Sequence, residues 1–79
     1  MAKKYRFELD EHDVGQLLDS LEIRAESWRR TAEYMRTGGM PEDELFIIEE
    51  CRDAEEADGL ASHYVSILES IQRQMEAQE

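Results

Sequence analysis

Three kinds of side chain in this sequence could do chemistry: two histidines, one cysteine, and carboxylates spaced three residues apart. Helical bundles use histidine as a metal ligand when a glutamate stands three residues before it. Leu9 stands three residues before His12, and Leu60 stands three residues before His63. Neither histidine fits that metal-binding pattern. We therefore expect His12 to be exposed at a helix start and His63 to lie at the boundary of a helical core.

Cys51 is the only cysteine, so an internal disulfide and a multi-cysteine zinc site are both excluded. Nucleophilic catalysis requires the thiolate form of the side chain. Glu49, Glu50 and Asp53 surround Cys51 in the sequence, and negative neighbours disfavour a thiolate. We expect Cys51 to be a small packing residue rather than a nucleophile.

Pairs of carboxylates three residues apart can hold a magnesium ion for hydrolysis. The candidate pairs for such a site are Glu8 with Glu11, Glu50 with Asp53, and Glu55 with Asp58. The first pair stands at an expected helix entrance and the second spans an expected helix cap. With 20 acidic residues among 79, such pairs also arise readily by chance. The sequence therefore predicts no enzyme, no catalytic residue, no metal ion and no cofactor.

The negative charge is concentrated in the second half of the chain. The net charge is −11, and residues 39–79 carry twelve acids against two bases. Nine of the seventeen residues from 42 to 58 are acidic. Such a surface is repelled by nucleic-acid phosphates and anionic membranes, so we expect it to bind neither. A basic protein is the electrostatically matched partner.

The first ten residues, MAKKYRFELD, contain basic residues without a following apolar run. The sequence therefore predicts no signal peptide and no membrane-spanning helix. A cytoplasmic location is the expectation that follows.

Apolar residues recur at steps of four and three over residues 11–37, which predicts a long amphipathic helix. Asp10 suits its N-cap, and Gly38 suits its C-terminal end. A second long helix is predicted over residues 54–76, with Asp53 and Glu56 as its capping box. The two helices share a predicted core seam: Val14, Leu18, Leu21, Ala25, Trp28, Ala32, Ala57, Ala61, Tyr64, Leu68, Ile71 and Met75.

Two shorter elements complete the predicted fold. Pro41 and the acids after it favour a short helix over residues 42–51, although residues 45–48 also fit a short strand. Residues 4–9 alternate apolar and charged side chains, which favours an extended lead-in whose aromatic rings fold back on the core. The expected fold is a single all-helical domain over residues 1–79, an antiparallel hairpin joined through the short helix.

Pairing the two seams antiparallel gives a register in which paired residue numbers add to 89. Trp28 then faces Ala61, and Ala32 faces Ala57, so that large side chains meet small ones. A register slipped by one heptad is the alternative.

Several apolar residues point away from this seam: Leu17, Leu60, Val65 and Ile67. A second copy that covers them would make a dimeric four-helix bundle. A monomeric three-helix bundle is the alternative, and the sequence does not decide between them.

We expect a small non-enzymatic protein-binding module. Small acidic proteins of this type often come from phages and mobile elements, which suggests an inhibitor or modulator of a basic, nucleic-acid-binding protein. The expected partner-binding acidic face comprises Glu49, Glu50, Glu55 and Asp58, whose spacing by helical turns imitates phosphates. The alternative is an oligomeric scaffold or assembly subunit that uses its apolar faces, with the acids serving only solubility.

Overall fold

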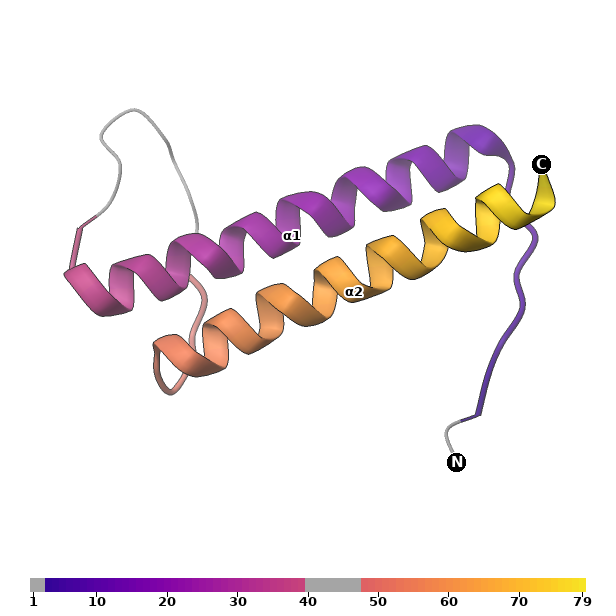
Figure 1. Ribbon diagram of the computed structural model, residues 1–79. Helices are drawn as coiled ribbons and strands as arrows, with labels where there is room; N and C mark the ends of the chain where they lie inside the picture. The colour runs from indigo at the N-terminus through magenta and orange to yellow at the C-terminus, as the bar shows by residue number, and fades with distance from the viewer. Residues whose placement is uncertain (1–2, 40–47) are drawn as a thin grey trace.

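The computed structural model describes residues 3–39 and 48–79. Helix α1 spans Glu11–Thr37 and helix α2 spans Ala54–Gln78. The helices run antiparallel and side by side, with the start of α1 and the end of α2 at one end of the pair (Figure 1). The described residues contain no strand, and the predicted all-helical hairpin is confirmed. Neither described helix is both long enough and apolar enough to cross a lipid bilayer.

Helix α1 occupies the predicted range because its two ends are capped by local chemistry. The Asp10 carboxylate accepts a hydrogen bond of 2.8 Å from the backbone N–H of Asp13. At the other end, Gly38 adopts φ 75°, and its N–H donates to the carbonyl oxygen of Tyr34 at 2.7 Å. Left-handed backbone is strained for residues with a side chain, so glycine is suited to this position.

Helix α2 begins at the predicted cap, but the predicted capping box differs in one bond. The Asp53 carboxylate accepts from the Glu56 N–H at 2.8 Å. The Glu56 carboxylate reaches back to the N–H of Arg52 at 3.0 Å, whereas a capping box returns to the cap residue itself. The guanidinium of Arg52 also contacts Glu56 at 3.4 Å, which favours this longer reach. The helix continues to Gln78, two residues beyond the predicted end.

The tightest packing lies near the end of the hairpin where α2 begins. Trp28 and Ala32 of α1 and Ala57 and Ala61 of α2 form one buried cluster, as the register summing to 89 places them. Ala32 and Ala57 are both 0% exposed, so α1 and α2 approach closely here. We call this the closed end, and we call the other end, where α1 starts and α2 ends, the open end.

The seam loosens toward the open end. Val14, Leu18 and Leu21 of α1 and Ile71 and Met75 of α2 are only partly buried. Two helices alone leave the flanks of their contact uncovered, and only the closed end receives a third layer. Cys51 and Ala54 belong to that layer and pack against the buried cluster.

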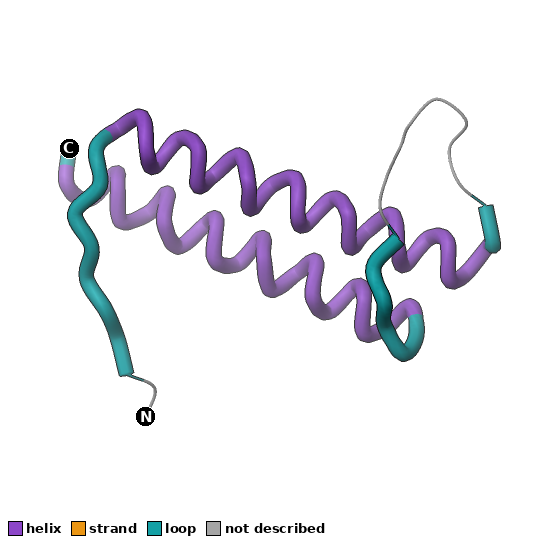
Figure 2. The backbone as a smooth tube through the Cα atoms, turned by 180° about the vertical axis from the view of Figure 1, so that it is seen from behind, coloured by secondary structure: helices purple, strands orange, loops and turns teal. Residues whose placement is uncertain are grey.

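The expected helix over residues 42–51 is not present in its described part. Residues 48–53 form a loop that runs from the side of α1 to the start of α2 (Figure 2). The N–H of Glu49 donates to the side chain of Thr31 at 3.0 Å instead of to a helical carbonyl. This contact with α1 holds the backbone of residues 48–51 in an irregular path. The remainder of that prediction, residues 42–47, lies outside the described residues.

The prediction that the lead-in aromatics fold back on the core was wrong. Residues 3–9 have neither helix nor strand; they pass the end of α2 and then extend beyond the helix pair (Figure 1). Tyr5 is 69% exposed and Phe7 is 80% exposed. The two rings stack on each other, with centroids 6.5 Å apart. The rings therefore contact each other and solvent rather than the buried cluster of the helices.

Candidate functional site

The predicted acidic face divides into two parts, and the first is centred on Glu49. One carboxylate oxygen of Glu49 lies 3.0 Å from a guanidinium nitrogen of Arg24 on α1. The Glu49 side chain is 19% exposed, compared with 47% for Arg24. The guanidinium also lies over the Trp28 ring, 5.7 Å from its centroid. Glu49 therefore attaches the loop to α1, and its charge is largely matched within the chain.

The second part of the acidic face lies at the first turns of α2. Asp58 forms an ion pair and hydrogen bond with Arg36 near the end of α1. That hydrogen bond raises the pKa of the Arg36 guanidinium, and the charges of Asp58 and Glu55 raise it further. Glu55 thus lies close enough to share the field of the same arginine. Glu55 and Asp58 stand one helical turn apart, which corresponds to about 5–6 Å between Cβ atoms.

These two parts do not form one continuous ridge. The arginines that bind them, Arg24 and Arg36, are twelve residues apart on α1, or about 18 Å along the helix axis. Glu50 is exposed and makes no ion pair with any described residue. The predicted ridge of four evenly spaced carboxylates is therefore replaced by two paired acids and two exposed ones, Glu50 and Glu55.

The segment from residue 48 to residue 58 carries surplus negative charge after the ion pairs that the structure describes for it are counted. Six carboxylates lie between residues 48 and 58, and three arginines pair with them, Arg24, Arg36 and Arg52. The difference is three uncompensated negative charges in this segment. These charges stand on the surface at the start of α2.

The residues that could have carried catalysis lie apart from one another. His12 is exposed at the start of α1, and His63 is exposed midway along α2 beside the Tyr64 ring. The Cys51 thiol donates to the carbonyl oxygen of Asp53 at 3.6 Å. Within residues 3–39 and 48–79, no three His, Cys, Asp or Glu side chains are grouped as metal ligands would be.

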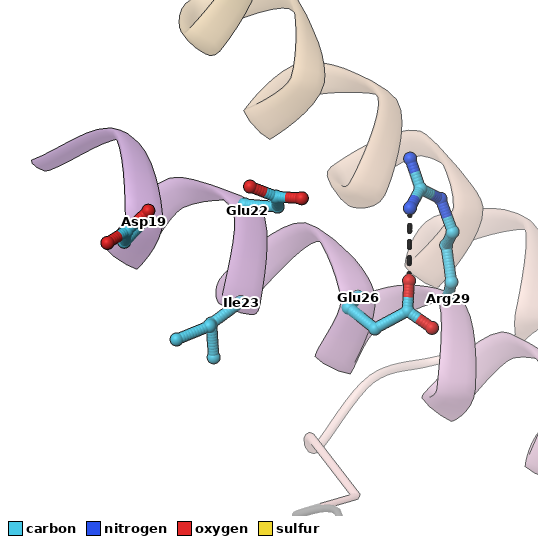
Figure 3. Close-up of a pocket in the computed structure, with 5 residues that line it drawn as sticks. All are labelled: Asp19, Glu22, Ile23, Glu26 and Arg29. Atoms are coloured by element: carbon cyan, nitrogen blue, oxygen red, sulfur yellow. Dashed lines mark hydrogen bonds and ion pairs between the residues drawn. The ribbon is translucent and has the colours of Figure 1, made fainter. Parts of the chain in front are cut away.

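A shallow hollow on the outer face of α1 was not predicted from the sequence. Its lining includes Asp19, Glu22 and Glu26, and Glu26 pairs with Arg29 at 3.1 Å (Figure 3). Ile23 projects from the same face, is 66% exposed and points away from α2 (Figure 3). The sequence did contain a signal for it. Ile23 lies off the core seam, with Asp19 four residues before it and Glu26 three residues after it. All of the lining comes from one helix, so the hollow has no opposing wall.

A larger hollow lies at the open end, between the lead-in and the two helices. Its lining is mixed, and the polar part comprises Arg6, Glu8, Glu11, Gln74, Gln78 and Glu79. Its apolar lining comprises Tyr5, Phe7, Leu9, Val14, Leu17, Ile71 and Met75. Among the predicted oligomer residues, Leu17 lines this hollow and is 40% exposed. Leu60 packs against the buried cluster at the closed end, while Val65 and Ile67 are partly buried along α2. The predicted oligomer face is thus spread along the hairpin, and only Leu17 reaches the open-end hollow.

One buried polar atom has no partner in the described part of the chain. The indole nitrogen of Trp28 is enclosed without a hydrogen-bond acceptor, although Trp28 is only 6% exposed. An unpaired buried donor lowers stability. The ring remains buried because its apolar area fills the space above the small residues of α2.

Comparisons of the chain with protein-family models, with curated proteins and with solved structures find no significant match.

Proposed function

We propose that this chain is a non-enzymatic protein-binding module that docks on a basic partner through its closed end. The supporting observation is the charge surplus between residues 48 and 58, which remains after Arg24, Arg36 and Arg52 are paired. The contact residues we assign are Glu50 and Glu55, with Asp58 beside them. Glu49 holds the loop on α1 and supports this surface from behind.

The physical basis of the proposal is electrostatic complementarity. Exposed carboxylates attract a basic surface over a distance of about 8–10 Å at physiological salt and accelerate association. The net charge of −11 strengthens this attraction and disfavours binding to nucleic acid or to an anionic membrane. The hairpin supports this surface, because Asp53 caps the first turn of α2, which carries Glu55.

The sharper form of the proposal assigns the partner to the nucleic-acid-binding proteins. A basic surface that accepts phosphates also accepts carboxylates at comparable spacing. Glu55 and Asp58 are one helical turn apart, and the shared Arg36 leaves part of their joint charge uncompensated. In this form the chain is an inhibitor or modulator that competes with nucleic acid for the partner.

A second candidate function is an assembly subunit that binds through apolar surface. The exposure of Leu17, Tyr5 and Phe7 around the open-end hollow favours it. The two functions use opposite ends of the hairpin, so mutations can separate them.

The test is a capture experiment at physiological salt from a lysate of the native host. The baits are the wild type, a Glu50→Gln/Glu55→Gln variant and a Glu69→Gln/Glu76→Gln control. The control removes the same charge from exposed positions elsewhere on α2. We expect a basic protein to be held by wild type and control, lost by the closed-end variant, and released by added double-stranded DNA. Equal capture by all three baits contradicts the proposal.

A further inference from the structure

The lead-in, residues 3–9, is a segment that neither helix buries. It contains no helix, strand or turn, all of its residues are exposed, and it runs outward without doubling back (Figure 2). No backbone hydrogen bond joins residues 3–9 to any other described residue. The N–H and carbonyl groups of this segment are therefore available to another molecule.

The side chains of the lead-in alternate as they do on a β-strand. Tyr5, Phe7 and Leu9 are 69%, 80% and 51% exposed. The Tyr5 and Phe7 rings stack with their centroids 6.5 Å apart and their planes at 25°. Two residues of a strand advance by about 6.6 Å and place both side chains on the same face. The two rings therefore have the spacing of a strand, and they form an aromatic row on one face of the segment.

The charge of the lead-in is opposite to that of the closed end. Residues 3–9 hold three bases, Lys3, Lys4 and Arg6, against the single acid Glu8, which gives a net charge of +2. Lys3 lies over the Tyr5 ring, 5.6 Å from its centroid, and neither Lys4 nor Arg6 is paired with an acid among the described residues. A basic surface repels this segment, whereas an acidic surface attracts it.

We propose that the lead-in binds the free edge of a β-sheet on an acidic protein, where it adds one strand. In strand addition, the backbone of an extended segment supplies hydrogen bonds, and its alternate side chains supply specificity. Tyr5 and Phe7 pack on the apolar face of the partner's sheet, while Lys4 and Arg6 face carboxylates on its other face. Seven residues suffice, because strands are usually 3–10 residues long.

Other occupants fit the lead-in less well. The described residues contain no strand, so this part of a second copy has no sheet edge. Two lead-ins paired with each other bring like charges together, and a two-stranded ribbon alone is only marginally stable. Nucleic acid is repelled by the net charge of −11 and by the acids that follow directly, Asp10, Glu11 and Asp13.

The test uses designed three-stranded antiparallel sheet proteins as probes, each with one unpaired edge strand. The first probe carries glutamates on the solvent face of that strand and valines on the other face. The second probe has lysines in place of the glutamates, and the third keeps the glutamates but has prolines that remove edge N–H groups. We expect calorimetry to show that the full chain binds the first probe at least about tenfold more tightly than the other two.

Two lead-in variants test which side chains make the contact. Tyr5→Ser/Phe7→Ser and Arg6→Glu should each weaken binding to the acidic sheet by about tenfold or more. Both changes lie outside α1 and α2, so helical circular dichroism should be unchanged. The matched controls are Ile23→Ser on α1 and Arg73→Glu on α2, which alter exposed residues of the same kinds. Both controls should bind the probe like the wild type.

Hydrogen exchange of the backbone amides gives a readout that is specific to strand addition. A strand at a sheet edge directs alternate N–H groups toward its neighbour. In the complex, the amides of residues 5, 7 and 9 or those of residues 4, 6 and 8 should therefore exchange more slowly, but not both sets.

Three results would overturn the proposal. They are a wild type that does not bind the acidic sheet, equal slowing of both sets of amides, and equally tight binding of a single-stranded oligonucleotide that the same lead-in changes abolish. The last result would show recognition by charge and stacking rather than by a sheet edge. Glu50→Gln/Glu55→Gln should bind the acidic sheet like the wild type, so failure here is distinct from failure of partner capture at the closed end.

Discussion

The backbone N–H of Glu49 donates a hydrogen bond of 3.0 Å to Oγ1 of Thr31, a side chain that is 0% exposed. The same hydroxyl donates to the carbonyl oxygen of Ser27 at 2.9 Å, so its donor and one acceptor position are both used. Together with the Arg24–Glu49 ion pair, this bond attaches the loop to α1. It thereby positions Glu50, which follows directly, on the surface that we assign to partner binding.

We predict that Thr31→Val destabilises the chain by about 1–2 kcal/mol, because the Glu49 N–H loses its acceptor in a partly buried place. Valine matches the shape of threonine, so little packing is lost. Urea unfolding followed by helical circular dichroism measures the change. Thr31→Ser keeps the hydroxyl, so its stability should lie between that of the wild type and that of Thr31→Val. Equal stability of wild type and Thr31→Val would show that the bond contributes nothing.

Loss of the α2 cap should destabilise the hairpin by about 1 kcal/mol, as is typical when an aspartate N-cap becomes alanine. The variant is Asp53→Ala, which removes the acceptor of the Glu56 N–H. Thermal unfolding gives the value, with Asp53→Asn as the control that retains a capping oxygen. If Asp53→Ala and Asp53→Asn melt at the same temperature, the cap does not contribute the predicted stability.

A larger side chain at the point where the two helices approach most closely should also destabilise the fold. Ala57 is 0% exposed and packs in the cluster with Ala32, so Ala57→Leu has no space for its added carbons. We expect a cost of about 1–3 kcal/mol. Ala77→Leu, at an exposed position near the end of α2, is the matched control and should leave stability almost unchanged. If chemical denaturation finds Ala57→Leu as stable as this control, the helices do not approach closely there.

The Arg36–Asp58 pair should add only a small, salt-dependent increment of stability, since both side chains are about half exposed. A double-mutant cycle with Arg36→Gln and Asp58→Asn measures the coupling, which should vanish at about 1 M salt. The pKa of Arg36 is raised in the folded chain, so its contribution is complete below the ordinary pKa of arginine. It is lost only as pH rises through the raised value, so the coupling should be constant from neutral to moderately alkaline pH. A coupling that disappears in that range contradicts the assignment.

The hairpin could be predicted from local patterns, because those patterns act through local physics. The four-three spacing of apolar residues and the caps at Asp10, Asp53 and Gly38 depend only on neighbours in the chain. These signals indicated where both helices begin and where α1 ends. The course of residues 48–51 could not be predicted this way, because it depends on Thr31, eighteen residues earlier in the sequence.

The acidic face was harder to predict than the fold, since a carboxylate's role depends on which cation the fold brings to it. Glu49 and Asp58 looked equivalent to Glu50 and Glu55 in sequence. The hairpin brings Arg24 and Arg36 of α1 to the first two and leaves the others exposed. The open-end hollow was missed because the lead-in aromatics were expected on the core, and only their exposure reveals it.

The most direct test of the central claim is the affinity of the captured basic partner for three purified proteins, measured by calorimetry at several salt concentrations. The proteins are the wild type, Glu50→Gln/Glu55→Gln and the Glu69→Gln/Glu76→Gln control. We predict that the closed-end variant binds at least about tenfold more weakly, with a shallower salt dependence, and that the control binds like the wild type. Equal weakening by both variants would show that only net charge matters, and unchanged affinity in both would show that the closed end is not the binding surface.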